Sequence, residues 1–258
     1  MSVRIEKSGR VWTVVLSRPE ARNAMDPETA DQLTAAFLEF NSDESASVAV
    51  FWGEGGAFCS GWDLKRAAAL DDDAFFDAHN LPQQGDDIPQ ALLGPTRLAL
   101  DKPVIAAVAG PAVAGGMELA MWCDFRVVEE SAYFGVYCRR WGIPLIDGGT
   151  VRLPRLVGEG RAREIVLTGR QVTAEESVRI GLAEYRVCDG TSRERAESLA
   201  REIAAHPQIC VRADRRSLQN QHGKSVRDAM TFEWYNGREA LMLEGIKGAG
   251  KFGKSSED

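Results

Sequence analysis

The amino-acid sequence predicts an α/β fold, with strands and helices mixed in residues 1–190 and a helical region at 191–258. The continuous apolar stretch KPVIAAVAG has the composition of a strand buried on both faces. Helical patterns alternate with further strand patterns, and they predominate after Gly148. With 258 residues, 44% of them hydrophobic, the chain is long enough to bury a substantial core.

The N-terminal part begins with strand, helix and strand patterns in succession. VRIEKSGRVWTVVLSRP predicts two strands joined by a turn at Ser8-Gly9. MDPETADQLTAAFLEF predicts a helix with Asp26 as its N-cap and Pro27 as its first residue, because these residue types favour those positions. SVAVFWG predicts a strand ending at Gly53, and the glycine-rich loop GEGGAFCSGWDLK follows it.

The central part is predicted as a loop, a buried strand, a helix and another strand. Residues 66–90 are polar and irregular, which indicates a loop on the surface or beside a site. After the buried strand, GPAVA predicts a short loop, MELAMWCD a helix and FRVVEE a strand. The later helical patterns are GGTVRLPRLVG, GRAREIVLTG, TAEESVRIG and TSRERAESLAREIAAH, with two more helices between about 207 and 250.

Charge and cysteine content exclude some classes of protein. A formal net charge of −7 and a pI near 5.2 argue against a general nucleic-acid binder. The five cysteines contain no CxxC pair and suit free thiols in a reducing compartment. The start MSVRIEKSGR is too polar for a signal peptide, and no apolar run reaches the roughly 18 residues of a membrane span. We therefore expect a cytoplasmic protein with no membrane partner.

The stretch VAGPAVAGGMELAMWCD contains residues that a helix made only for packing would avoid. Gly115 and Gly116 stand at the helix start, and Glu118 is a single acid among apolar residues. Glycines there let a ligand approach free N–H groups that favour negative charge, as an oxyanion hole requires. Burial would raise the pKa of Glu118 towards neutrality, which suits a catalytic acid or base. The alternative is a glycine-rich helix packed tightly under the sheet.

Several motifs together resemble the enoyl-CoA hydratase/isomerase (crotonase) superfamily. KPVIAAVAGPAVAGGMELAMWCD is similar to the superfamily signature and GGAFCSGWDLK to its other ligand loop. SRPEARNAM, VRLPRLVGEGRAREIVLTGR and TAEESVRIGLAEYRV fit the same order. The resemblance implies a crotonase-like spiral of ββα units and a C-terminal helical region used for trimerisation. It also implies a homotrimer or a dimer of trimers that acts on acyl-CoA thioesters, with no metal and no cofactor beyond the coenzyme A of the substrate.

The resemblance assigns binding residues by position. The backbone N–H groups of Trp62 and Gly115 would hold the thioester oxygen as it becomes enolate-like, and loss of one such donor typically costs about 2.7–4 kcal/mol. The adenine and phosphates of CoA would lie along Ala21, Arg22, Cys59, Ser60 and Asp63, while Lys251 and Phe252 would reach CoA in a neighbouring subunit. For Arg22 and Lys251 the alternative is a charge that is only solvated.

One position departs from the hydratase pattern. Hydratases of this superfamily use two glutamates to handle one water, and Glu118 matches the first. The second position, in FGVYCRRWG, holds Cys138. A thiol has an ordinary pKa of about 8.5 and replaces a carboxylate poorly. Arg139 and Arg140 would lower that pKa, whereas a cysteine that only packs is the alternative.

Asp147, in GIPLIDGGT, is the candidate for the second carboxylate. An aspartate in this neighbourhood resembles the extra carboxylate of dienoyl-CoA isomerases and the nucleophile of aromatic acyl-CoA dehalogenases. The alternative is an N-cap of the next helix, a position that aspartate favours. We predict Glu118 and Asp147 as the catalytic residues.

These observations predict an acyl-CoA enzyme that stabilises a thioester enolate and hydrates or dehydrates an enoyl-CoA. The alternatives are a (di)enoyl-CoA isomerase, an acyl-CoA hydrolase or dehalogenase that uses Asp147, and a CoA-ester-binding paralogue without activity. Trp62 and Trp141 hint at an aromatic-lined pocket, but the acyl group itself is left open.

Overall fold

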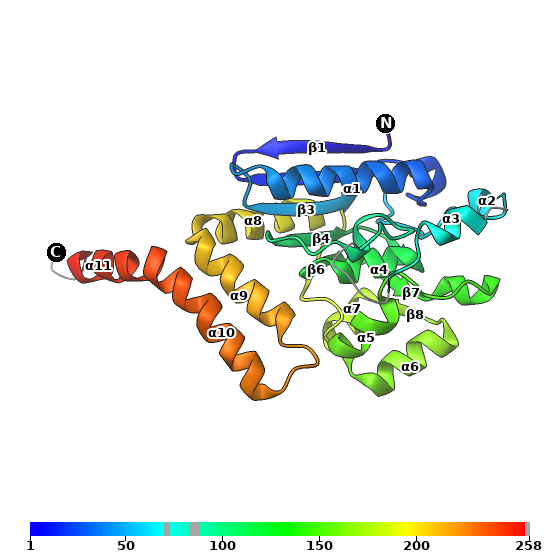
Figure 1. Ribbon diagram of the computed structural model, residues 1–258. Helices are drawn as coiled ribbons and strands as arrows, with labels where there is room; N and C mark the ends of the chain where they lie inside the picture. Colours follow the sequence, from blue (N-terminus) through cyan, green and yellow to red (C-terminus); the bar gives the residue numbers. More distant parts are fainter. Residues whose placement is uncertain (70–72, 83–87, 256–258) are drawn as a thin grey trace.

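The computed structural model describes residues 1–69, 73–82 and 88–255, with side chains described as far as residue 250. Two sheets lie at the centre of the molecule, and helices cover them (Figure 1). The larger sheet has six strands in the order β1-β2-β3-β4-β6-β9, and the smaller has three in the order β5-β7-β8. The strands are β1 (Val3–Ser8), β2 (Val11–Leu16), β3 (Val48–Gly53), β4 (Val104–Val108), β5 (Pro111–Val113), β6 (Phe125–Glu129), β7 (Tyr133–Gly135), β8 (Gln171–Thr173) and β9 (Tyr185–Val187).

Five strands of the six-stranded sheet, β1, β2, β3, β4 and β6, follow the predicted strand patterns. β1 and β2 form the predicted antiparallel hairpin, with Gly9 in the turn at a φ of +59°. The other neighbouring strands of this sheet are parallel to each other. Helix α1 (Pro27–Ser42) begins as predicted: the Asp26 side chain accepts a hydrogen bond from the amide of Thr29, and Pro27 is the first helical residue.

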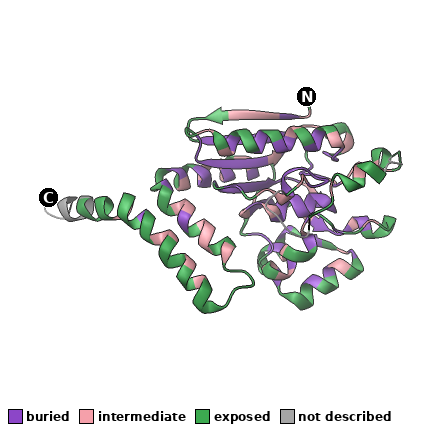
Figure 2. Cartoon of the chain, viewed as in Figure 1, coloured by how far each residue is buried: buried purple, intermediate pink, exposed green. Residues whose placement is uncertain are grey.

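Alternate residues of the central strands enter two different hydrophobic clusters. In β4, Ile105 and Ala107 pack with the apolar face of helix α8 (Ser192–Ala205), while Val104, Ala106 and Val108 face the opposite cluster. The cluster that contains Val104, Ala106 and Val108 also contains residues of α1 and of helix α4 (Gly115–Trp122). Both faces of the sheet are therefore buried, as the continuous apolar stretch predicts (Figure 2).

The second sheet was not predicted, because its strands are only three residues long. GPAVA, predicted as a loop, contains β5, which pairs with β7, and β8 pairs with β7 from the other side. Three residues are too few to show the period-2 alternation by which a strand is recognised. Strand β9 escaped prediction for the same reason.

The remaining helices and helical turns complete the covering layers and form a projecting arm. They are η1 (Pro19–Ala21), α2 (Leu64–Ala67), α3 (Asp73–Asp77), η2 (Pro95–Arg97), η3 (Tyr137–Trp141), α5 (Gly149–Val157), α6 (Glu159–Thr168), α7 (Ala174–Arg179), α9 (Gln208–Asn220), α10 (Val226–Ala240), η4 (Leu241–Gly245) and α11 (Ile246–Ser255). The segment 66–90, predicted as irregular, thus contains the end of α2 and the short helix α3, and its residues 70–72 and 83–87 lie outside the described part. Within the described ranges, no helix is both long enough and apolar enough to cross a membrane.

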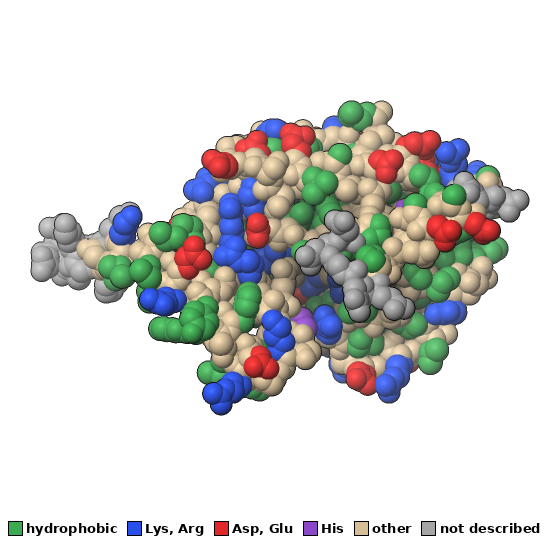
Figure 3. Space-filling view, viewed as in Figure 1, with side chains coloured by type: hydrophobic (Ala, Val, Ile, Leu, Met, Phe, Trp, Pro, Cys, Tyr) green, Lys and Arg blue, Asp and Glu red, His purple; other side chains and the backbone are tan. Residues whose placement is uncertain are grey.

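The last three helical segments project from the core. Figure 1 shows α10 and α11 extending away from the sheets, joined to the core through α9. Their residues are mostly exposed, and large apolar side chains are among them (Figures 2 and 3). The core is packed on itself, whereas this arm leaves apolar surface uncovered.

Candidate active site

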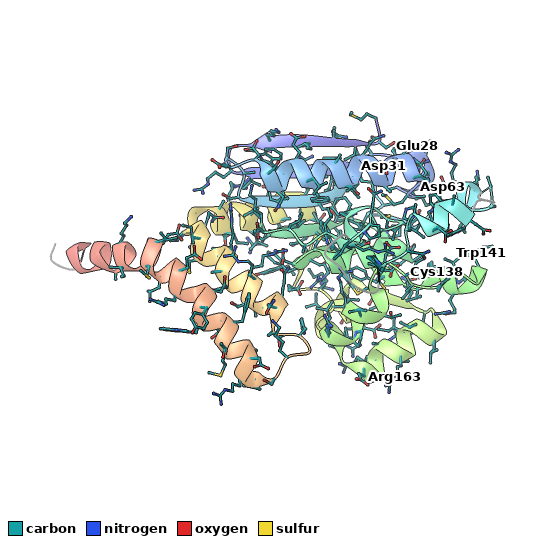
Figure 4. The ribbon with its side chains drawn as sticks, in the orientation of Figure 1. Glu28, Asp31, Asp63, Cys138, Trp141 and Arg163 are labelled. Atoms are coloured by element: carbon teal, nitrogen blue, oxygen red, sulfur yellow. The ribbon has the colours of Figure 1, made fainter. Side chains whose placement is uncertain are left out.

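A pocket lies where the glycine-rich loop after β3 meets the start of α4. Besides these two segments, η3 and the loop before α5 contribute to its wall. The wall is mainly apolar, with Trp62, Leu64, Leu92, Leu93, Tyr137, Trp141, Ile143, Pro144 and Ile146. Among the described residues of this wall, the carboxyl groups are those of Glu118 and Asp147. Figure 4 shows Cys138 and Trp141 on η3 at the same side of the molecule as Asp63.

Backbone pairing joins the glycine-rich loop to the segment that leads into α4. The amide of Cys59 donates to Pro111 O, and the amide of Val113 donates to Cys59 O, which forms a parallel bridge between Cys59 and Ala112. Trp62 and Gly115, which follow these bridged segments, both lie in the wall of the pocket. The bridge of Met25 to Trp62 uses the carbonyl of Gly61 and the amide of Asp63, so the Trp62 N–H points away from Met25.

The start of α4 is held very close to this loop. Gly115 is the first residue of α4, so its N–H has no acceptor within the helix. A Cβ on Gly61, whose φ is +89°, would lie 2.9 Å from the Gly115 nitrogen, and a Cβ on Gly116 would lie 2.0 Å from Cys59 O. Ala114, the residue before Gly115, has a φ of +54°, a conformation that costs energy for a residue other than glycine. The glycines therefore serve a close backbone approach beside the pocket.

Glu118 is buried on α4 and is held by two backbone amides. Its side chain is 2% exposed, and Oε1 accepts hydrogen bonds from Asp147 N at 2.9 Å and Gly149 N at 2.8 Å. Burial, followed by the nearby Asp147 carboxyl, raises the pKa of Glu118 to about 7, although the two amides act in the opposite direction. A carboxyl with this pKa exchanges protons readily near neutral pH.

Asp147 is also buried, and its carboxyl faces elements far away in the sequence. Oδ1 accepts hydrogen bonds from the Thr96 hydroxyl at 2.7 Å and from Leu93 N at 3.2 Å. Burial raises the pKa of Asp147, against the lowering effect of these donors and of Arg97 and Arg152. The N-cap interpretation of Asp147 is wrong, because Gly148 precedes α5 and no side chain caps that helix.

Each carboxyl keeps one oxygen free. Glu118 Oε2 and Asp147 Oδ2 accept no hydrogen bond from the described residues. Neither oxygen is among the buried polar atoms that lack a partner, so both have access to the pocket. The arrangement can therefore fix each carboxyl through one oxygen and present the other to a ligand.

Cys138 lies in the pocket wall as a neutral thiol. Burial and the Glu118 carboxyl raise its pKa, and the lowering effect of Arg139 is the smaller one. Arg139 therefore acts in the expected direction, but burial outweighs it and the net pKa is raised. The Cys138 thiol is 8% exposed and packs against the core, which fits the interpretation of a packing cysteine.

Three of the predicted CoA-binding residues lie together where the glycine-rich loop contacts residues 21 and 22. Ser60 N donates to Arg22 O, and the Ser60 hydroxyl donates to Ala21 O at 3.3 Å. Arg22 has a φ of +50° and an exposed side chain. Ala21, Arg22 and Ser60 therefore form one surface next to the pocket.

The other predicted CoA-binding residues are placed differently. The Cys59 thiol is fully buried, burial raises its pKa to about 12, and its amide and carbonyl are used in the bridge to β5. Asp63 caps α2 and forms an ion pair with Arg18 at 3.2 Å. Lys251 and Phe252 belong to α11, but their side chains lie outside the described part.

Two polar residues that no sequence motif indicates hold the site. Thr96, on η2, donates to Asp147, and Arg152, on α5, donates to the backbone carbonyls of Asp147 and Thr96. Arg152 stands in the motif VRLPRLVG, where its helical spacing suggests an ordinary surface arginine. No local pattern indicates that Thr96 and Asp147 meet, because 51 residues separate them.

The chain belongs to the enoyl-CoA hydratase/isomerase family, whose model matches residues 6–241. It is 34% identical to enoyl-CoA hydratase EchA19 of Mycobacterium tuberculosis, over 94% of this chain and 90% of that protein. It is 40% identical to the putative enoyl-CoA hydratase/isomerase YngF of Bacillus subtilis, over 80% of this chain and 76% of that protein. It is 37% identical to a carnitinyl-CoA dehydratase of Salmonella typhi, over 82% and 78%.

Solved structures share the fold over nearly the whole chain. The crystal structure of enoyl-CoA hydratase EchA1 from Mycobacterium marinum superposes with a TM-score of 0.88 at 28% identity, covering 98% of this chain and 96% of that one. An enoyl-CoA hydratase from Mycobacterium tuberculosis H37Rv gives a TM-score of 0.88 at 30% identity, with the same coverage. The predicted crotonase-type α/β fold with its C-terminal helical region is thereby confirmed.

Proposed function

We propose that this protein adds water reversibly to the double bond of an enoyl-CoA thioester. The observation that carries the proposal is that Trp62, Gly115, Glu118 and Asp147 all line one pocket, so their backbone N–H groups and carboxyls would act on the same ligand. The named activities of the relatives, enoyl-CoA hydratase and carnitinyl-CoA dehydratase, are supporting observations. Coenzyme A enters as part of the substrate, and we propose no other cofactor or metal.

In the proposed reaction the thioester oxygen accepts hydrogen bonds from Trp62 N–H and Gly115 N–H. Negative charge grows on this oxygen when water attacks the β carbon, because the electron pair of the double bond moves towards the carbonyl. Donors fixed by the backbone need no reorganisation as that charge develops. The partial charge at the N-terminus of α4 has the same effect.

Glu118 and Asp147 would divide the proton transfers. One carboxylate takes a proton from water as its oxygen bonds to the β carbon, and the other carboxyl gives a proton to the α carbon. Burial raises the pKa of both carboxyls, that of Glu118 to about 7, and their donors differ. Two backbone amides hold Glu118, whereas the Thr96 hydroxyl and Leu93 N hold Asp147. The free oxygens Oε2 and Oδ2 are the atoms that would carry these protons.

An isomerase is the second candidate, and Cys138 is the observation that favours it. With a neutral thiol at the position of the second hydratase glutamate, water has one carboxylate fewer to orient it. A double-bond shift needs only removal of a proton from one carbon and its return to another. Glu118 and Asp147 suffice for that reaction without water.

Steady-state turnover of an acyl-CoA panel distinguishes the candidates. A hydratase forms a 3-hydroxyacyl-CoA from a trans-2-enoyl-CoA, whereas an isomerase moves the double bond with no gain of mass. Binding of the acyl-CoA without any product would leave a CoA-ester-binding protein. Calorimetry adds an independent test: a CoA thioester should bind more tightly than free CoA, and equal affinity would contradict the oxyanion hole.

We further propose a homotrimer, or a dimer of trimers, in the cytoplasm. The exposed apolar side chains of α10 and η4 support assembly. The cytoplasmic assignment is supported by the free state of all five cysteines, three of which are buried.

A further inference from the structure

Arg152 occupies an unusual place for an arginine on an amphipathic helix. Its guanidinium is turned inward from α5, and Nη1 donates to Asp147 O at 2.9 Å while Nη2 donates to Thr96 O at 2.6 Å. One rigid, planar group therefore ties η2 to the loop that carries Asp147. Arg152 contacts the backbone of two residues whose side chains also bond to each other.

The backbone beside Arg152 leaves space that only glycine allows. Gly148 has a φ of +97°, and a Cβ at this position would lie 2.1 Å from Arg152 Nη1. Gly149 follows, and a Cβ there would lie 2.9 Å from Glu118 Oε1. The Gly149 N–H donates a hydrogen bond to this same oxygen. The pair of glycines thus admits the guanidinium on one side and the carboxyl on the other.

The hydrogen bonds form a continuous chain from Arg152 to both carboxyls. Arg152 holds the Asp147 carbonyl, Thr96 holds the Asp147 carboxyl, and Asp147 N–H holds the Glu118 carboxyl. Each link fixes a group through atoms that do not face the ligand. A shift at Arg152 would therefore move both carboxyls together.

We propose that Arg152 and Thr96 are positioning residues that hold Asp147 and Glu118 in their reactive arrangement without touching the substrate. This inference rests on the proposed function, since it assigns a role towards the same two carboxyls. Displacement of reacting groups by about 1 Å can cost roughly 100-fold in rate. We expect a loss of that order when the Arg152 hydrogen bonds are removed.

The charge of Arg152 adds an effect on proton affinity that can be measured separately. In the described part of the chain, the charged and titratable groups that act on the two carboxyls or lie against them are Arg97 of η2, Cys138 of η3 and Arg152 of α5. Arg152 lowers the pKa of both carboxyls, against the raising effect of burial. Removing the charge should therefore raise both pKa values further.

Three arginine variants separate geometry from charge. Arg152→Gln removes the charge and the bidentate contact, so we expect turnover to fall about 100-fold and the pH profile of kcat/KM to move to higher pH. Arg152→Lys keeps the charge but replaces the planar fork, so turnover should fall while the profile stays in place. Arg155→Gln is the matched control, because Arg155 lies on the same helix with an exposed side chain and should change neither readout.

Thr96 provides a test that leaves Arg152 intact. Thr96→Val has nearly the same shape but lacks the hydroxyl that donates to Asp147, so kcat should fall and the pH profile should shift upward. Thr96→Ser restores the hydroxyl and should recover most of the turnover. If Thr96→Val behaves as the wild type, or if Thr96→Ser is as impaired as Thr96→Val, the positioning role is refuted.

Titration of the carboxyls by NMR tests the inference independently of activity. In Arg152→Gln, the pKa values of Glu118 and Asp147 should both rise, and unchanged values together with unchanged turnover would overturn the proposal. If the wild type turns over no acyl-CoA, the proposed function fails. The titrations then test the contact itself: a rise of both pKa values in Arg152→Gln supports a guanidinium held beside the two carboxyls, and unchanged values contradict it.

Discussion

At the scale of single residues, the two carboxyls of the site are held in the same way. Glu118 and Asp147 each accept hydrogen bonds from the protein through one carboxyl oxygen, and each exposes the other oxygen to the pocket. Glutamine at 118 would preserve the acceptor for Asp147 N and Gly149 N but could not transfer a proton. For Glu118→Gln we expect turnover to fall by about 10²–10⁴ with affinity for a CoA thioester unchanged.

Steady-state kinetics and calorimetry on the same preparation check this prediction. Glu175→Gln is the control, because Glu175 is exposed on α7 and this substitution makes the same chemical change away from the pocket. Normal turnover in Glu118→Gln would make this residue a structural one.

The raised pKa of Glu118 also predicts how stability depends on pH. The native state holds a proton on Glu118 up to about pH 7, whereas the unfolded chain releases it near 4.5. Between these values the native state binds more protons, so the free energy of unfolding falls as pH rises, by up to about 3 kcal/mol. Asp147 acts in the same direction, since its pKa is raised too.

Urea unfolding of the wild type and of Glu118→Gln at pH 5 and pH 8 measures this effect. The variant lacks the titrating group, so its free energy of unfolding should fall less over this range. Parallel pH dependence in the two proteins would contradict the raised pKa.

Asp147 and Cys138 can be separated by one pair of variants. Asp147→Asn keeps an oxygen that accepts from Leu93 N and Thr96, so it should retain its melting temperature and lose most of its turnover. Cys138→Ser should be mild in both respects, because the thiol is neutral and packed. Turnover on the best acyl-CoA beside a thermal melt checks both, and the opposite result would transfer the catalytic role to the thiol.

At the scale of elements, the helix α4 depends on its second glycine for its position. A Cβ on Gly116 would lie 2.0 Å from the backbone oxygen of Cys59, which no side-chain rotation relieves. Gly116→Ala should therefore push α4 away from the glycine-rich loop, cost about 1–3 kcal/mol of stability, and weaken the preference for a thioester over free CoA.

Gly160→Ala is the matched helical control for this substitution. A Cβ on Gly160, in α6, meets nothing within 4 Å, so this variant should gain up to about 1 kcal/mol. Thermal melts and calorimetry of both variants give the comparison. A Gly116→Ala protein with normal stability and normal thioester preference would show that α4 tolerates the displacement.

Elements with a long pattern could be predicted from the sequence, and short ones could not. The hairpin of β1 and β2, the buried strand β4 and the capped helix α1 each carry a local signal over several residues. The three-residue strands β5, β7, β8 and β9 owe their conformation to pairing with distant segments. Glu118, Asp147, Trp62 and Gly115 come from motifs, whereas the inward turn of Arg152 depends on contacts that no motif contains.

At the scale of the whole molecule, the arm formed by α10, η4 and α11 leaves large apolar side chains exposed. Val226, Met230 and Trp234 follow one another at intervals of four residues along α10 and are 77%, 63% and 61% exposed. Leu241, Met242 and Ile246 extend this apolar surface along the arm. An apolar stripe of this extent on a projecting helix marks an interaction site, and closed symmetric assemblies are the commonest way to cover one.

We therefore predict that the protein sediments as a trimer or a dimer of trimers at micromolar concentration. The double variant Met230→Glu with Trp234→Glu places two charges in the stripe, so it should sediment as a monomer while the core keeps its fold. Leu38→Glu is the control, since Leu38 is 49% exposed on α1 and away from the arm. If Lys251 and Phe252 reach CoA in a neighbouring subunit, the monomeric variant also loses affinity for CoA thioesters. A wild-type monomer in sedimentation would refute the assembly, and an undiminished affinity in the monomeric variant would refute the contribution of the neighbouring arm.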